Sequence, residues 1–89
     1  MYRTNELLDN LKSTFHLTSD YAIAKKLGVS TSSIYTYRAQ RSFFDVKMCF
    51  EVAELLDLDP LELIACSHLE RAERAGDEKL ISFWKQHVH

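Results

Sequence analysis

Glycine and proline are rare in this chain, and each one falls where a helical pattern begins or ends. Gly28 and Gly76 each follow a segment with apolar residues at helical spacing, and Pro60 opens another such segment. Hairpins depend on turn residues of this kind, and two glycines and one proline cannot connect several strands. The 89 residues therefore predict an all-α fold of about one domain's size.

Polar caps and apolar periodicity together divide the chain into six expected helices. Ser30, Asp59 and Asp77 are suited to cap helix starts, and either Thr18 or Ser19 could cap the second helix. Glycine ends a helix in the left-handed conformation without a Cβ penalty. The expected helices cover residues 4–15, 20–27, 31–39, 45–56, 60–75 and 78–86.

The same periodicity predicts which side chains face the core. On helix 45–56 the expected inward residues are Val46, Cys49, Phe50, Ala53 and Leu56. On helix 60–75 they are Leu61, Ile64, Ala65, His68, Leu69 and Ala72. One aromatic ring of the loop at 40–44, either Phe43 or Phe44, is expected to lie under the core. Cys49 and Cys66 fall on apolar faces, and we expect reduced core thiols rather than a disulfide.

The segment from Asp20 to Gln40 has the pattern of two short helices packed across a tight turn. Its apolar and small residues follow a fixed register, namely Ile23, Ala24, Leu27, Gly28, Val29 and Ile34. Ala24 allows the close backbone approach that crossing helices require, and Gly28 supplies the turn. This register resembles the helix-turn-helix of the lambda repressor and Cro class of bacterial and phage DNA-binding proteins, the XRE class.

The resemblance implies a domain organisation as well as a function. It implies a five-helix repressor-type helix-turn-helix domain over residues 1–67, with the helix-turn-helix at about 20–40. Residues 68–89 would then form an additional C-terminal helical extension, which either packs on the core or dimerises. Members of this class occupy palindromic operators as two-fold dimers, so double-stranded DNA and a homodimer are the expected partners.

Helix 31–39 is the expected reading helix, because its two faces differ in polarity. At 100° per residue, Ile34 and Tyr37 share the apolar face. In the class that the chain resembles, residues at the start of this helix and one turn later touch base edges. Carried over, the base-reading candidates are Thr31, Ser32, Tyr35 and Thr36. The other interpretation is that these hydroxyl groups only cap and solubilise the helix start.

Charge is unevenly distributed along the chain. Residues 20–47 hold five basic and two acidic side chains, whereas residues 48–89 hold four basic and nine acidic ones. An acidic remainder would be repelled by phosphate, which would orient the basic segment toward a duplex. The candidates for phosphate contact just beyond the reading face are Arg38, Gln40, Arg41 and Lys47.

The last expected helix carries a large apolar surface near the chain end. Leu80, Phe83 and Trp84 share one face of it. This face is a candidate dimer interface, and the alternative is packing within the same chain onto helices 4–15 and 60–75.

Other chemistry is not indicated. No glycine-rich phosphate loop, structural-zinc spacing or grouped Ser, His and Asp is visible, so we expect no enzyme activity, cofactor or metal. No apolar run reaches the roughly 20 residues that span a bilayer, and no signal peptide is visible, so a cytoplasmic protein without membrane association is expected.

Taken together, the sequence predicts a sequence-specific DNA-binding transcriptional regulator, most simply a small phage or bacterial repressor that acts by occupying its operator. The alternative is a protein-interaction module that keeps the repressor fold without specific DNA binding. The net charge of −2 and the acidic Asp20 at the start of helix 20–27 motivate this alternative.

Overall fold

The computed structural model describes all residues from 1 to 89, and all regular structure in it is helical. Six helices follow one another, which confirms the all-α prediction. They are α1 (Thr4–Thr14), α2 (Asp20–Leu27), α3 (Thr31–Arg38), α4 (Val46–Leu56), α5 (Pro60–Ala75) and α6 (Glu78–Lys85). Each observed boundary lies within one residue of the expected one, because the caps that set the boundaries are local. None of the six helices combines the length and the apolar character that crossing a membrane requires.

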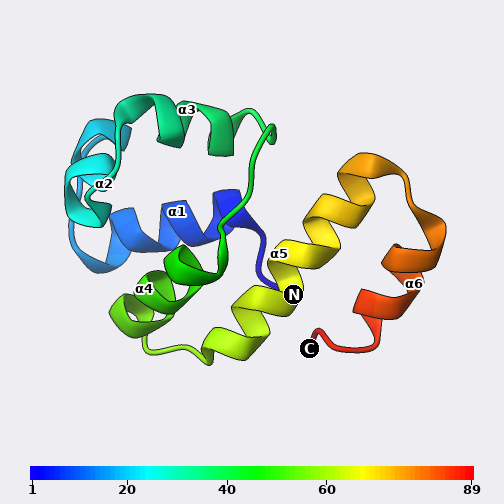
Figure 1. The fold of residues 1–89 in the computed structure, drawn as a ribbon. Helices are drawn as coiled ribbons and strands as arrows, with labels where there is room; N and C mark the ends of the chain where they lie inside the picture. The colour runs from blue at the N-terminus through cyan, green and yellow to red at the C-terminus, as the bar shows by residue number, and fades with distance from the viewer.

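Helices α1 to α4 surround the main core, and α5 packs on α4 at the side of this core (Figure 1). The helix α6 turns back and lies against α5, far from α2 (Figure 1). The largest fully buried side chains of the core come from six different segments, namely Leu8, Leu11, Ile23, Ile34, Phe44, Val52 and Leu63. Burying this apolar area is the main favourable contribution to folding.

Loop 39–45 is anchored by one aromatic ring, as expected. Phe44 is 1% exposed and meets the ring of Tyr37 edge-on, with ring centroids 5.0 Å apart. Its carbonyl oxygen accepts hydrogen bonds from the Ser67 hydroxyl and from Arg71. The loop therefore has a fixed conformation, held between the core and α5.

The predicted inward face of α4 was wrong at two positions. Val46 and Phe50 are each 53% exposed, whereas Met48 and Val52 are buried beside Cys49 and Ala53. The helix is apolar on most of its circumference, so periodicity allowed more than one inward face. Packing of α4 against α1 and α5 buries Met48 and Val52 in place of Val46 and Phe50, and Cys49 and Ala53 of the expected face stay buried.

The predicted inward face of α5 was also wrong at one position. Leu61 is 70% exposed at the first turn, while Leu63 and Cys66 are buried. The helix continues without interruption across the expected domain boundary between residues 67 and 68. Both cysteines of the chain are buried and free, and burial raises the pKa of Cys49 to about 11.

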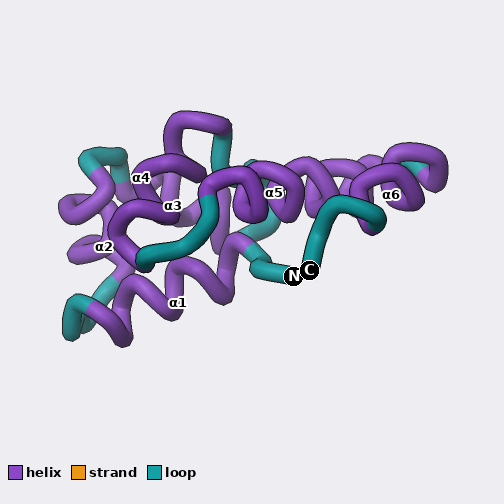
Figure 2. The backbone as a smooth tube through the Cα atoms, turned by 90° about the horizontal axis from the view of Figure 1, so that it is seen from below, coloured by secondary structure: helices purple, strands orange, loops and turns teal.

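Polar contacts fasten the N-terminal segment to α5. The carboxylate of Glu70 accepts from both the backbone N–H and the hydroxyl of Thr4, at 2.8 Å each. Arg3 forms an ion pair with Glu73 at 2.9 Å. The two chain ends meet, since the amino group of Met1 lies 2.6 Å from the carbonyl oxygen of His89 (Figure 2).

Candidate nucleic-acid interface

The corner between α2 and α3 is built by local hydrogen bonds. The Ser19 hydroxyl accepts from the N–H of Ala22, which caps α2. Gly28 ends α2 in the left-handed conformation with φ of 69°. The Ser30 hydroxyl then accepts from the N–H of Ser33 at 3.2 Å, which caps α3. The glycine turn and the Ser30 cap that the sequence predicted are both confirmed.

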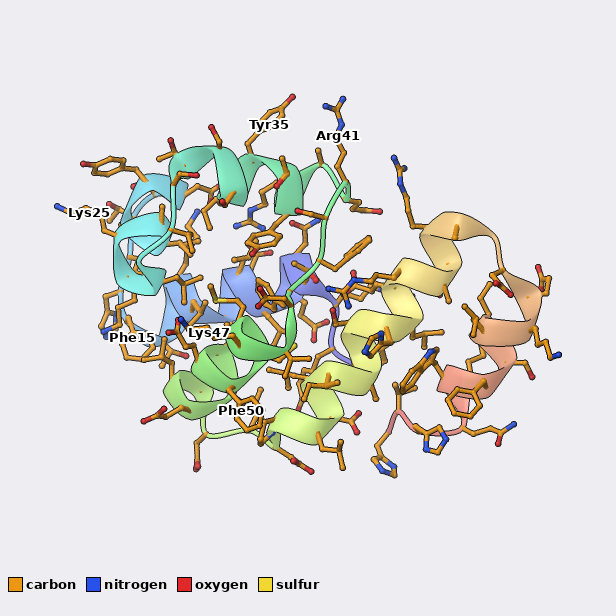
Figure 3. All side chains as sticks on the ribbon, viewed as in Figure 1. Phe15, Lys25, Tyr35, Arg41, Lys47 and Phe50 are labelled. Atoms are coloured by element: carbon orange, nitrogen blue, oxygen red, sulfur yellow. The ribbon has the colours of Figure 1, made fainter.

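One side chain fixes the orientation of α3 on the core. Ile34 is 1% exposed and points inward, and Tyr37 packs partly buried against the core. On the opposite face, Thr31, Ser32 and Tyr35 are exposed to solvent. Tyr35 is 64% exposed, and its ring points away from the body of the protein (Figure 3). This face of α3 therefore presents two hydroxyl side chains and one phenol ring together.

Thr36 differs from the other three base-reading candidates. Its hydroxyl donates to the carbonyl oxygen of Ser33 at 2.9 Å and lies 2.8 Å from the hydroxyl of Ser42. These contacts join the end of α3 to the loop that follows. The hydroxyl of Thr36 is thereby engaged within the protein, and the side chain is only partly exposed.

Arg38 is committed to intramolecular ion pairs. Its guanidinium lies 2.9 Å from the carboxylate of Asp9 and 3.1 Å from that of Asp20, and it also donates to the carbonyl oxygen of Asn5. Burial disfavours the charged guanidinium, but the hydrogen bonds that it donates to the carboxylates of Asp20 and Asp9 outweigh burial and raise the pKa of Arg38. Arg38 thus holds α3 to α1 and α2, and it is not free for the phosphate contact that the sequence suggested.

The ion pair with Arg38 also neutralises the charge of Asp20 at the start of α2. A free carboxylate at the start of α2 would repel a nearby phosphate. Here Arg38 compensates the charge of Asp20, and Lys12 lies 4.0 Å from the same carboxylate oxygen. The acidic residue is therefore part of the packing of α1, α2 and α3.

The three remaining phosphate-contact candidates occupy two separate places. Gln40 and Arg41 lie together in the loop after α3, and both are exposed. Arg41 has no ion-pair partner and points outward on the same side of the protein as Tyr35 (Figure 3). Lys47 lies well apart from Arg41, beside the turn at Gly28 (Figure 3). The fold therefore brings Gln40 and Arg41 near the exposed face of α3 and leaves Lys47 at another position.

Two basic residues that the sequence did not single out lie beside Arg41. Arg71 and Arg74 line a shallow hollow together with Arg41. Both belong to the acidic C-terminal part of the chain, so the charge distribution along the sequence did not indicate them as candidates for phosphate contact. No short-range signal connects residue 41 with residues 71 and 74, because only the packing of α5 brings them together.

The helix α6 covers little of its own apolar face. None of its residues is buried, and Leu80 and Phe83 are exposed. Trp84 stacks on His68 of α5 with ring centroids 4.6 Å apart, and burial together with Arg71 lowers the pKa of His68. A hollow of about 380 Å³ remains between α5 and α6 and is lined mainly by Leu61, Ile64, Phe83 and Trp84. Within the chain, Trp84 thus packs on α5.

The donor set for metal binding is sparse. No three or more His, Cys, Asp or Glu side chains gather closely enough to hold an ion. The surfaces available for binding a partner are therefore the exposed face of α3, the arginines of the α3–α4 loop and α5, and the apolar face of α6.

These features define a small all-helical protein with an exposed polar helix beside unpaired arginines. No solved structure matches the chain, and no described protein family has a sequence profile that matches it. The chain is similar to the protein "Gp-c" of Pseudoalteromonas phage PM2, with 30% identity over 84 residues, which cover 93% of this chain and 91% of that protein. The chain belongs to the same family as this phage protein.

Proposed function

We propose that this protein is a sequence-specific DNA-binding transcriptional regulator of the lambda repressor and Cro class, a small phage-related repressor that blocks transcription by occupying its operator. In this proposal α2 and α3 form the helix-turn-helix within a five-helix repressor-type domain, and α6 is the additional helix. The polar face of α3 enters the major groove. Membership in a family with a phage protein agrees with the setting in which such regulators occur.

The observation that carries the proposal is the exposed face of α3 beside Arg41. Ile34 holds the helix by one side, which leaves Thr31, Ser32 and Tyr35 free to approach base edges. Hydroxyl groups can donate or accept, and the Tyr35 ring could contact a thymine methyl group. Such side chains discriminate modestly, so DNA shape would contribute to specificity. Arg41 and Gln40 would contact the phosphate backbone and set the register of the helix.

The proposal includes a homodimer that forms through α6. Leu80 and Phe83 are exposed on α6, and they adjoin the apolar hollow against α5. A two-fold dimer would present two reading helices to half-sites about 34 Å apart. Phe83→Lys should turn the dimer into a monomer in light-scattering measurements, whereas Lys79→Ala on the same helix should leave the mass unchanged. A wild-type protein that is monomeric at high concentration would remove this part of the proposal.

A gel-shift assay with the DNA that flanks the protein's own gene tests the function directly. The wild type should shift this DNA in the presence of competitor, and log affinity should fall with log salt by about 0.9 for each phosphate that is neutralised. Arg41→Ala should weaken binding to all sequences equally. The double variant Ser32→Ala, Tyr35→Ala should lose the preference for the operator but keep non-specific binding.

The control variant is Thr14→Ala, an exposed position at the end of α1, whose neighbour Phe15 lies on the other side of the protein from Arg41 (Figure 3). It should behave as the wild type. If the wild type gives no shift, or if the α3 variant binds with unchanged preference, α3 is not the reader. A protein-interaction module that keeps the fold without specific DNA binding would then be the better description.

A further inference from the structure

Three arginines from two distant parts of the sequence converge on one surface hollow. Arg41 belongs to the loop after α3, and Arg71 and Arg74 belong to the last two turns of α5. The hollow has a volume of about 400 Å³, and Ser42 and Phe43 complete its lining on the loop side. The residues that line it belong to the C-terminal end of α5 and to the loop after α3, and both segments lie on the same edge of the molecule as α3 (Figure 1).

The protein does not neutralise these three guanidinium groups. None of them forms an ion pair with a carboxylate, whereas Arg3 and Arg38 are both paired. Arg71 donates to the carbonyl oxygens of Phe43 and Phe44, at 3.3 and 2.8 Å, which orients it without cancelling its charge. Three like charges at one hollow repel one another unless an anion lies between them.

The acidic side chains nearest to this hollow are already engaged. Glu73 pairs with Arg3, and Glu70 accepts two hydrogen bonds from Thr4. Both carboxylates border the neighbouring depression, which Arg74 shares, and neither lines the hollow with Arg41. No carboxylate lines the hollow, its only charged lining residues are the three arginines, and its volume admits a phosphate group.

We infer that the Arg41, Arg71 and Arg74 hollow binds a backbone phosphate of the DNA duplex that α3 reads. The inference rests on the proposed function and extends it, because it assigns DNA contact to α5, outside the predicted helix-turn-helix. Guanidinium groups suit this ligand, since their planar donors match phosphate oxygens in pairs. The hollow acts as a clamp that fixes the register of α3 on the duplex and adds affinity without sequence preference.

The roles of the three arginines differ. Arg41 and Arg74 are exposed and provide the phosphate contacts. Arg71 is partly buried and holds the backbone of Phe43 and Phe44, so it mainly positions the loop that carries Arg41. Arg74 is the best residue for a test, because it makes no hydrogen bond or ion pair within the protein whose loss could disturb the fold.

The test compares the salt dependence of DNA binding for the wild type, Arg74→Ala and the matched control Lys79→Ala. Both substitutions remove one exposed positive charge from the same end of the chain, but Lys79 lies on α6 and does not line the hollow. Arg74→Ala should make the log–log salt slope shallower by about 0.9, with equal loss of affinity for operator and unrelated DNA. Lys79→Ala should keep the wild-type slope, and Arg74→Lys should keep most of it.

Two results would overturn the inference, and they differ in what they say of the proposed function. If the wild type binds DNA with the expected operator preference but Arg74→Ala keeps the full slope, or if Lys79→Ala changes it by the same amount, the clamp is wrong and the DNA-binding function stands. If the wild type binds no duplex DNA, both the phosphate clamp and the proposed DNA-binding function are wrong. Equal melting temperatures for the variants and the wild type exclude a folding defect as the cause of any change.

Discussion

The chain builds the same corner twice, once between α2 and α3 and once between α5 and α6. Gly28 and Gly76 both end a helix in the left-handed conformation with φ of 69°. The side chains of Ser30 and Asp77 then cap the next helix in the same way, because each accepts a hydrogen bond from the N–H three residues further on. Each of the two helices that follow has eight residues. The two corners therefore share the same kind of helix end and the same kind of helix start.

The helices that follow these corners have different surroundings. The helix α3 lies against both α1 and α2, and its Ile34 is almost fully buried. The helix α6 has α5 as its main neighbour. None of the residues of α6 is buried, although they include Phe83 and Trp84. Local signals thus determine where a helix begins and ends. The number of neighbouring helices determines how much of its surface is covered and how firmly it is held.

Removing one aromatic side chain from beneath α3 and one from α6 tests most strongly whether the two helices differ in how firmly they are held. Phe44→Ala empties the site beneath α3 and should lower the free energy of unfolding by about 3–5 kcal/mol. This loss is a large part of the total stability of a small domain. Phe83→Ala on α6 removes a side chain that is half exposed, and the free energy of unfolding should fall by less than about 1 kcal/mol. Urea denaturation followed by circular dichroism measures both values.

Equal losses for the two phenylalanine variants would contradict the comparison. They would show that α6 contributes as much to the core as the loop after α3 does. The measurement requires low protein concentration, because a dimer through α6 would add concentration-dependent stability to the wild type.

The two glycines give a second, smaller and more closely matched pair of substitutions. A Cβ atom at either position would meet no atom within 4 Å, so alanine introduces only backbone strain at φ of 69°. Gly28→Ala should lower the free energy of global unfolding by about 1–2 kcal/mol. Gly76→Ala should affect mainly the docking of α6, seen as faster amide hydrogen exchange in residues 78–86.

An equal shift of the global transition in both glycine variants would mean that α6 unfolds together with the core. That result would make α6 an integral part of the domain, despite its exposed face. Unchanged exchange in both regions would instead show that the turns tolerate the strain.

The smallest expected effect concerns the contact between the chain start and α5. Burial raises the pKa of Glu70, and the hydrogen bonds from Thr4 lower it less. A carboxyl group whose pKa is raised on folding binds more protons in the folded state, so stability falls as the pH rises from the ordinary value of 4.5 through the raised one. Glu70→Gln keeps an acceptor for Thr4 and should remove this part of the pH dependence.

Thermal unfolding between pH 4 and pH 7 measures the Glu70 effect. The melting temperature of Glu70→Gln should rise relative to that of the wild type as the pH increases. Glu78→Gln, at an exposed carboxylate on α6, serves as control and should follow the wild type. Parallel curves for all three proteins would show that Glu70 is not held in the folded state as described.

Features that depend on residues within about four positions were predictable from the sequence. The start of α3 at Ser30, the end of α2 at Gly28 and the start of α6 at Asp77 are confirmed, because one side chain or one backbone conformation determines each. The exposed positions of Thr31, Ser32 and Tyr35 follow from the same local geometry once Ile34 faces inward. The role of this face in reading DNA stays a prediction.

The inward faces of α4 and α5 were less predictable, for a physical reason. The helix α4 is apolar around most of its circumference, so several of its faces satisfy the same periodicity, whereas Leu61 lies in the first turn of α5 and is left 70% exposed. The exposed Val46, Phe50 and Leu61 show that the choice among these faces depends on the neighbouring helices. Their positions could be determined only from the packed structure.

The sequence by itself determined the fold class, the helix boundaries and the polar face of α3. Only the tertiary structure decided which positive charges are available for a partner. Arg38 follows the reading face in sequence but is paired with Asp9 and Asp20, whereas Arg74 is distant in sequence and lies unpaired beside Arg41. Helix boundaries depend on hydrogen bonds within one turn. The pairing of a charge depends on which side chains the packed helices bring within a few ångströms of it.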